Sequence, residues 1–157
     1  MNSSRTVRGA DAADIDQLAA LAARFYAEEG FATPPESIRA NLAMLIHSSA
    51  ARVLLAESDG RAVAFAVATS TPGLEHNLVA ELQDLYVLPE HRSHGVAAML
   101  VDEVMSWARA YGCEVVDVVV DAAGDTRHAL TDWYRRRGFH DQGRRLLSAS
   151  LSDGRSR

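Results

Sequence analysis

The sequence is poor in features that mark several large classes of protein. Its 157 residues include one cysteine, Cys113, which excludes an intramolecular disulfide. The first residues contain no apolar stretch that could act as a signal peptide or span a bilayer. Basic residues form no long cluster of the kind that nucleic-acid-binding proteins carry. We therefore expect a cytoplasmic protein that binds neither nucleic acid nor membrane; a homodimer remains open.

Signatures of metal and nucleotide sites are also scarce. His91 and His94 lie three residues apart, a spacing that a metal site can use, but no carboxylate or cysteine partner is obvious. The chain contains neither a G-x-G-x-x-G motif nor a G-K-[ST] motif. We expect no metal, and an unrelated nucleotide-binding α/β domain is disfavoured.

The length and composition of the chain are those of one ordinary folded domain. A hydrophobic content of 48% and a charged content of 24% are typical of a chain that buries a core without metal or disulfide support. We expect a single domain over residues 1–157, with residues 150–157 as a frayed tail. The formal net charge of -5 favours a cationic partner over an anionic one.

Apolar residues at helical spacing predict four helices. Three of them begin after a polar side chain that can cap the helix, and three end before a glycine: Gly30, Gly112 and Gly138. The predicted helices cover residues 12–29, 34–47, 96–111 and 126–137. Asp11 is the predicted N-cap of the first helix, with Asp14 three residues on, and Asp125 is the predicted cap of the fourth. Thr33 and Glu36 have the spacing of a capping box at the second.

Apolar runs between turn residues predict the strands. They lie before residue 11, on either side of the turn at 58–60, within 78–88 and 113–121, and once or twice within 140–151. Three early strands follow one another without a helix, whereas the strand–helix–strand unit from about 80 to 120 demands a right-handed parallel crossover. We expect a mixed α/β (α+β) fold with one central sheet of about six to seven strands flanked by four helices.

The turn within residues 88–100, LPEHRSHGVAAML, carries the clearest chemistry. It leads from a strand into a helix, whose first backbone N–H groups lack partners and carry a partial positive charge. Arg92 adds a full positive charge, and Gly95 permits a ligand to approach the backbone closely. The turn therefore predicts a phosphate-binding site.

Two short motifs occur in register with these elements. One is RSHGVA at residues 92–97, and the other is YRRRGF, which begins at Tyr134. Together they resemble the GNAT superfamily of acetyl-CoA-dependent N-acyltransferases, whose pyrophosphate loop reads Q/R-x-x-G-x-G/A and whose later helix ends in Tyr before Gly-Phe. The order of elements agrees over nearly the whole chain. The sequence departs from the family pattern at Arg127, where many members carry an Asn that lies near the cofactor.

The resemblance implies that acetyl-CoA binds in a cleft where the fourth strand diverges from its parallel neighbour. Backbone groups of Leu85, Tyr86 and Val87 are then expected to pair with the pantetheine arm. The expected pyrophosphate site consists of the backbone amides of Arg92, Ser93, His94, Gly95, Val96 and Ala97.

Acetyl transfer needs a proton acceptor, because a lysine-like amine has a pKa near ~10.4 and is protonated at neutral pH. Asp84 and Glu81 are the candidates. In an unbroken strand they project to opposite faces, so only one faces the cleft unless a bulge intervenes. We favour Asp84, because some aminoglycoside-modifying members have Asp directly before the same Leu-x-Val segment. By position in the family motif, Tyr134 is the acid that protonates the departing coenzyme A thiolate.

The acceptor is the least constrained part of the prediction. Glu28 and Glu29 lie where the first helix ends, a position at which the helix dipole disfavours anions. With Glu75, Glu81 and Asp84 they favour a cationic amine on a small molecule or peptide: an aminoglycoside, a polyamine or a lysine side chain. The same acids could equally be solubilising surface residues. The alternative function is a non-catalytic acyl-CoA-binding or sensing module.

Overall fold

The computed structural model describes residues 4–151, which fall into two compact units, one up to Val118 and the other from Val119 onward. Each unit is described by itself. The expectation of a single domain stays a prediction, and most of the predicted tail, residues 150–157, lies outside the described residues.

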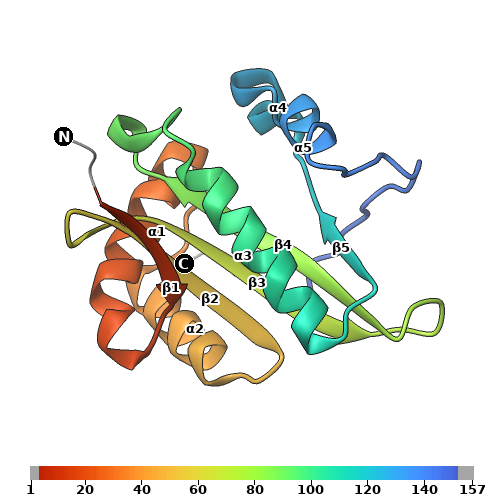
Figure 1. Ribbon diagram of the computed structural model, residues 1–157, viewed down its shortest axis with the longest axis horizontal. Helices are drawn as coiled ribbons and strands as arrows, with labels where there is room; N and C mark the ends of the chain where they lie inside the picture. The colour runs from red at the N-terminus through yellow and green to blue at the C-terminus, as the bar shows by residue number, and fades with distance from the viewer. Residues whose placement is uncertain (1–3, 152–157) are drawn as a thin grey trace. The chain divides into compact units, whose positions relative to one another are not determined.

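The first unit contains the sheet and most of the helices (Figure 1). Its strands are β1 (Arg5–Gly9), β2 (Ala51–Ser58), β3 (Arg61–Pro72), β4 (Leu78–Val87) and β5 (Val115–Val118). Its helices are the 3-10 turn η1 (Ala12–Asp14), α1 (Ile15–Glu29), α2 (Pro35–His47), the 3-10 turn η2 (Pro89–His91) and α3 (Val96–Tyr111). The second unit contains α4 (Ala122–His128) and α5 (Leu130–Arg135).

The sheet has five strands in the order β1-β2-β3-β4-β5, antiparallel except for the parallel pair β4 and β5. Helix α3 connects that parallel pair and crosses one face of the sheet, while α1 and α2 cover the other face (Figure 1). The mixed α/β class and the parallel pairing are confirmed. The number of strands is lower than predicted.

The missing strands are those expected within residues 140–151, where the structure has only irregular chain. Leu146 and Leu147 are adjacent and both largely exposed, so this segment does not present one apolar face. A strand of alternating pattern needs such a face against a core. Two neighbouring leucines were too weak a signal for a strand.

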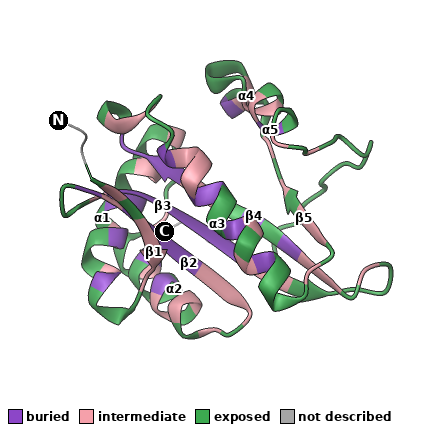
Figure 2. Cartoon of the chain, viewed as in Figure 1, coloured by how far each residue is buried: buried purple, intermediate pink, exposed green. Residues whose placement is uncertain are grey.

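The core lies along the central strands and on the inner sides of the helices that cover them (Figure 2). Residues 63–68 of β3 are all buried, as expected for a strand that is covered on both faces. The first helical segment begins after Asp11, as predicted: a capping box of Asp11 and Asp14 caps the 3-10 turn η1, which leads directly into α1 at Ile15.

The predicted fourth helix is two short helices. Ala129 separates them with a left-handed φ of 49°, which ends α4 and starts α5. Asp121, and not the predicted Asp125, caps α4 by accepting a hydrogen bond from the amide of Gly124. The Asp125 carboxylate instead accepts from the amide of Thr131 at 2.7 Å, across the break. Among residues 4–151, no helix combines the length and apolar character needed to cross a bilayer.

Candidate active site

The predicted phosphate loop connects η2 to α3 through a left-handed turn. Ser93 has φ 62° and Gly95 has φ 82°, and Gly95 is the N-cap residue of α3. Helix geometry leaves the first amides of α3 without an intrahelical acceptor. Ser93, His94 and Gly95 are exposed, and a Cβ placed on Gly95 would meet no protein atom within 4 Å. The loop therefore presents its backbone to open space at a helix N-terminus, the arrangement that suits a phosphate.

A second arginine contacts this loop from β1, an edge strand of the sheet. Arg5 of β1 donates from Nη1 to the carbonyl oxygen of His94 at 3.3 Å. Sequence reasoning did not identify Arg5, because it lies 89 residues away along the chain. Its cationic group adds to the positive potential at the start of α3.

Arg92, the predicted charge of the phosphate site, is directed toward β4 and α1. Its Nε donates to the carbonyl oxygen of Val87 at 2.9 Å, and its Nη2 donates to Glu28 at 2.7 Å. Its backbone amide donates to the carbonyl oxygen of Pro89 at 3.2 Å. The loop amides that remain for a ligand therefore begin after Arg92.

The parallel ladder between β4 and β5 is short. It runs from Val79 opposite Val115 to Leu82 opposite Val118, where β5 ends, whereas β4 continues to Val87. The segment of Leu85, Tyr86 and Val87 thus extends beyond the ladder, as a cleft for a pantetheine arm requires. Its role in binding stays a prediction.

A β-bulge at Gln83 decides how the two candidate bases are oriented. On β3, Val67 pairs with Asp84, while Ala68 pairs with Leu82 and Thr69 with Glu81, so Gln83 is the extra residue on β4. Directly paired residues share a face of the sheet, and Val67 and Thr69 are two apart on one strand. Glu81 and Asp84 therefore lie on the same face, which is the face covered by α1 and α2.

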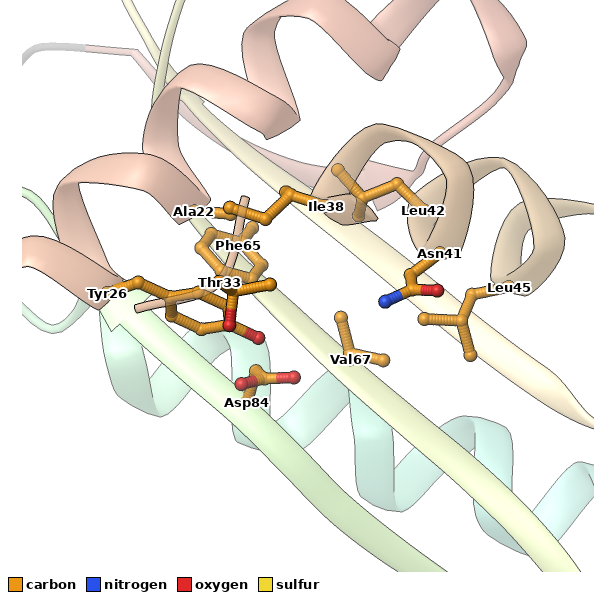
Figure 3. A pocket seen from close by; sticks show the side chains of 10 residues that line it. All are labelled: Ala22, Tyr26, Thr33, Ile38, Asn41, Leu42, Leu45, Phe65, Val67 and Asp84. Carbon is orange, nitrogen blue, oxygen red and sulfur yellow. The ribbon is translucent and has the colours of Figure 1, made fainter. Parts of the chain in front are cut away.

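Asp84 lines a small pocket between that face and the two helices (Figure 3). The cavity volume is about 40 Å³, and since ~10–15 Å³ is enough for one water molecule, it has room for a few waters or the end group of a ligand. The hydroxyl groups of Tyr26 and Thr33 point toward the Asp84 carboxylate, and Asn41 faces it from α2 (Figure 3). The other lining residues are Ala22, Ile38, Leu42, Leu45, Phe65 and Val67.

The pocket changes the acidity of both of its titratable groups. Burial raises the pKa of the Asp84 carboxyl above its ordinary value. Burial, and then the nearby charge of Asp84, raises the pKa of Tyr26. A carboxylate with a raised pKa is a stronger base, so Asp84 is better suited to accept a proton than an exposed aspartate. Glu81, by contrast, is exposed.

Sequence analysis missed Tyr26, Thr33 and Asn41. Tyr26 follows Ala22 by four residues on α1, so helical spacing could have placed it on the inner face. Thr33 was assigned to a capping box, but the N-cap residue of α2 is Pro34 and no side chain caps the helix. The capping prediction is wrong, and the Thr33 hydroxyl lines the pocket instead.

The predicted acceptor residues do not all come together. Glu28 contacts Tyr86 and Arg92, and Glu29 is the last residue of α1. Glu75 lies in the turn between β3 and β4, before Leu78. At ~3.3 Å per residue, Leu78 and Asp84 are about 20 Å apart along the strand, so Glu75 is remote from the pocket.

Tyr134 lies in the second unit, on α5. It is 6% exposed and packs edge to face against Trp133 and Phe139, with ring centroids at 5.0 and 5.2 Å. Burial raises its pKa to about 12, so its hydroxyl keeps its proton at neutral pH. Arg127, at the position of departure from the family pattern, donates to the carbonyl oxygen of Ala123 on its own helix.

The part of the chain that the structure describes has no group of three or more His, Cys, Asp or Glu side chains arranged to hold a metal ion. The first unit thus presents a glycine turn at a helix N-terminus and, on the other face of the sheet, a half-buried carboxylate, Asp84. A helix N-terminus suits an anionic ligand, and a carboxyl group with a raised pKa is a candidate for proton transfer.

Comparison with known proteins narrows the class of protein. The sequence profile of the acetyltransferase (GNAT) family matches residues 15–139. An aminoglycoside N(6')-acetyltransferase type 1 from Acinetobacter genomosp. 13 is 39% identical over 74 residues, which are 46% of this chain and 47% of that enzyme. The homologous enzyme from Acinetobacter haemolyticus is 37% identical over 94 residues, 56% of this chain and 61% of that enzyme. Both matches thus span less than two thirds of the relative's length.

Structural similarity extends over the whole fold. The crystal structure of an aminoglycoside N-acetyltransferase in complex with CoA aligns with a TM-score of 0.84 over 97% of this chain and 98% of that one, at 20% identity. This likeness concerns the fold. Because the family profile covers most of the chain, the protein belongs to the acetyltransferase (GNAT) family, as its two motifs predicted.

Proposed function

We propose that this protein is an N-acetyltransferase that moves the acetyl group of acetyl-CoA to a primary amine within a ternary complex. The observation that carries the proposal is the loop of residues 92–97. It opens α3 at the end of a strand that extends beyond its parallel neighbour. In this proposal the amides that follow Arg92 hold the pyrophosphate, and residues 85–87 flank the pantetheine arm.

Acetyl-CoA supplies a thioester whose carbonyl carbon is open to attack. The amine nitrogen forms the C–N bond, the C–S bond breaks, and coenzyme A leaves as a thiolate. A cationic amine loses two protons on its way to the amide. Asp84 takes the first, directly or through a water in the pocket, which frees the nitrogen lone pair for attack. Tyr134 gives its proton to the thiolate, and the second proton of the amine, released once the C–N bond has formed, passes to water and restores the Tyr134 hydroxyl.

The acceptor in this proposal is a cationic amine of the aminoglycoside class. Two named relatives act on aminoglycosides at a 6' nitrogen, and the Asp84 pocket has room for an end group but not for a sugar ring. A protonated amine reaching into the pocket meets a carboxylate and three polar side chains. Polyamines and lysine side chains remain the competing acceptors.

The proposal is tested by the release of free thiol from acetyl-CoA in the presence of candidate amines. We expect release with an aminoglycoside that carries a 6'-amino group, and at most background release with its 6'-hydroxyl counterpart. Spermidine and a lysine-containing peptide are tested in the same assay as the two competing classes of acceptor. Turnover with the lysine peptide alone would overturn the assignment of the acceptor class.

The same assay separates the enzyme from a non-catalytic acyl-CoA-binding module. Such a module would show a thermal shift with acetyl-CoA but no thiol release with any amine in the panel. Loss of both signals would overturn the proposed function altogether.

Replacing Tyr134 by Phe tests the proposed acid. The ring and its contacts with Trp133 and Phe139 remain, so the fold and the affinity for acetyl-CoA should change little. Turnover should fall by about 10²-fold, because a positioned proton donor contributes at least that much. Near-normal turnover under conditions where chemistry limits the rate would return Tyr134 to a packing role and leave a water as the acid.

A further inference from the structure

Glu28, near the end of α1, uses both oxygens of its carboxylate to hold residues around the phosphate loop. Oε1 accepts a hydrogen bond from the hydroxyl of Tyr86 at 2.6 Å, and Oε2 accepts from Nη2 of Arg92 at 2.7 Å. The side chains of Glu28 and Arg92 are 34% and 35% exposed, and both hydrogen bonds are short bonds to a charged carboxylate, the stronger kind of hydrogen bond. The carboxylate therefore links α1 to β4 and to the first residue of the loop.

Arg92 is held at several points by this arrangement. Besides the bond to Glu28, its Nε donates to the carbonyl oxygen of Val87, and its guanidinium lies 5.5 Å from the centre of the Tyr86 ring. A planar guanidinium can satisfy these contacts together, which a lysine ammonium cannot. Arg92 thus fixes the start of the loop to the end of β4.

Tyr86 supplies a rigid base for the arrangement. It is 3% exposed, and its ring stacks on Phe25 of α1 at 5.3 Å and lies 6.2 Å from Phe65 of β3. A buried hydroxyl needs a hydrogen-bond partner, and Glu28 provides it. Because the ring is fixed, the Glu28 carboxylate is fixed with it.

The loop that follows needs such support. Ser93 directly after Arg92 has φ 62°, a left-handed conformation that a non-glycine residue keeps only when its surroundings hold it. On the other side of the turn, α3 fixes the backbone. Arg92 fixes the near side, and Arg92 is in turn held by Glu28.

We propose that Glu28 is a positioning residue for acetyl-CoA: through Arg92 and Tyr86 it fixes the loop whose backbone amides receive the pyrophosphate. This inference rests on the proposed acetyl transfer at this loop. It gives Glu28 a role on the cofactor side of the reaction, where the sequence alone favoured the acceptor side. It also gives the Arg92 side chain a role in holding the loop and leaves the binding of phosphate to the backbone.

The test measures acetyl-CoA binding by calorimetry and the two KM values by thiol release with a 6'-amino aminoglycoside. Glu28→Gln removes the charge that holds Arg92, and we expect about tenfold weaker acetyl-CoA binding. The KM for the aminoglycoside should stay within about twofold of wild type. A rise in the aminoglycoside KM with unchanged acetyl-CoA binding would overturn the inference.

Arg92→Lys keeps the positive charge but loses the planar fork, and we expect a similar loss of acetyl-CoA affinity. Because both residues act through one contact, the double variant should bind about as weakly as either single variant. Two independent roles would multiply, giving about a hundredfold loss, and would overturn the inference. If the Glu28→Gln variant does not fold, the acetyl-CoA affinity of Arg92→Lys alone still tests the inference, and an unchanged affinity would overturn it.

Glu90→Gln is the matched control. It removes a second ion pair between α1 and η2, from Arg24 to Glu90, but this pair is long at 3.8 Å and half-exposed on both sides. We expect acetyl-CoA binding within about twofold of wild type. A wild-type protein that does not bind acetyl-CoA would instead refute the proposed function itself.

Discussion

The change of Gly95 to Glu is expected to raise the dissociation constant for acetyl-CoA by about 10³-fold. Gly95 lies at the start of α3, where a Cβ would project into open space in front of the loop. In the proposed complex that space holds the pyrophosphate. A like charge at ~4 Å costs ~4 kcal/mol at an effective dielectric constant of ~20, which corresponds to about 10³-fold in affinity. Calorimetry on the purified variant measures this loss.

The control for this prediction lies at the other end of the same helix. Gly112 also has a left-handed φ, 96°, so Gly112→Glu introduces comparable backbone strain and the same charge away from the loop. That variant should still bind acetyl-CoA, provided that circular dichroism shows both variants to be folded. Unchanged affinity in a folded Gly95→Glu protein would remove the loop as the cofactor site.

Replacing Asp84 by Asn should lower kcat by about 10³-fold with the acetyl-CoA affinity nearly unchanged. Asn has the same shape but cannot accept the proton of the amine, and a positioned general base contributes ~10²–10⁴-fold. The neighbouring candidate provides a direct comparison, because Glu81 lies on the same face of the sheet but is exposed. A larger loss in Glu81→Gln than in Asp84→Asn would transfer the role of base to Glu81.

The pH dependence follows from the direction of the Asp84 shift. Burial raises the pKa of this carboxyl, so it loses its function as a base at a higher pH than an ordinary aspartate, whose pKa is ~3.9. As the pH falls through the raised pKa, Asp84 becomes protonated and kcat/KM should fall. In Asp84→Asn this fall of kcat/KM at acidic pH should disappear, and the remaining pH dependence should be that of the substrate amine. Asp117→Asn, an exposed strand carboxylate, should keep the wild-type fall of kcat/KM at acidic pH.

Local patterns were sufficient to predict most of the fold. The N-cap at Asp11 and the glycine stops at Gly30 and Gly112 occur as predicted, because each depends on residues a few positions apart. The split of the fourth helix was missed, since Ala129 gives no sign of a left-handed conformation. Across the break, the Asp125 carboxylate accepts a hydrogen bond from the amide of Thr131, six residues further along the chain, a pairing that the helical pattern does not indicate.

The candidate site was predictable to the extent that it depends on backbone. A strand that leads through a glycine turn into a helix can be recognised from sequence, whereas the direction of a long side chain cannot. Arg92 illustrates this, since its guanidinium is held by Glu28, 64 residues away. The bulge at Gln83 was equally hidden, because it is defined by pairing with β3 and not by the sequence of β4.

Because of the bulge, the number of residues between two positions on β4 no longer gives their spacing in the sheet. Glu81 and Asp84 are three residues apart in sequence but occupy positions opposite Thr69 and Val67, which are only two apart on β3. A homologous strand that lacks the extra residue, with its acids at spacing two, would present the same pair of carboxylates to the same helices. Gaps at this position in an alignment therefore change the length of the strand without changing its chemistry. Equivalent acids among such enzymes are better matched through their partners on the adjacent strand than through residue counts.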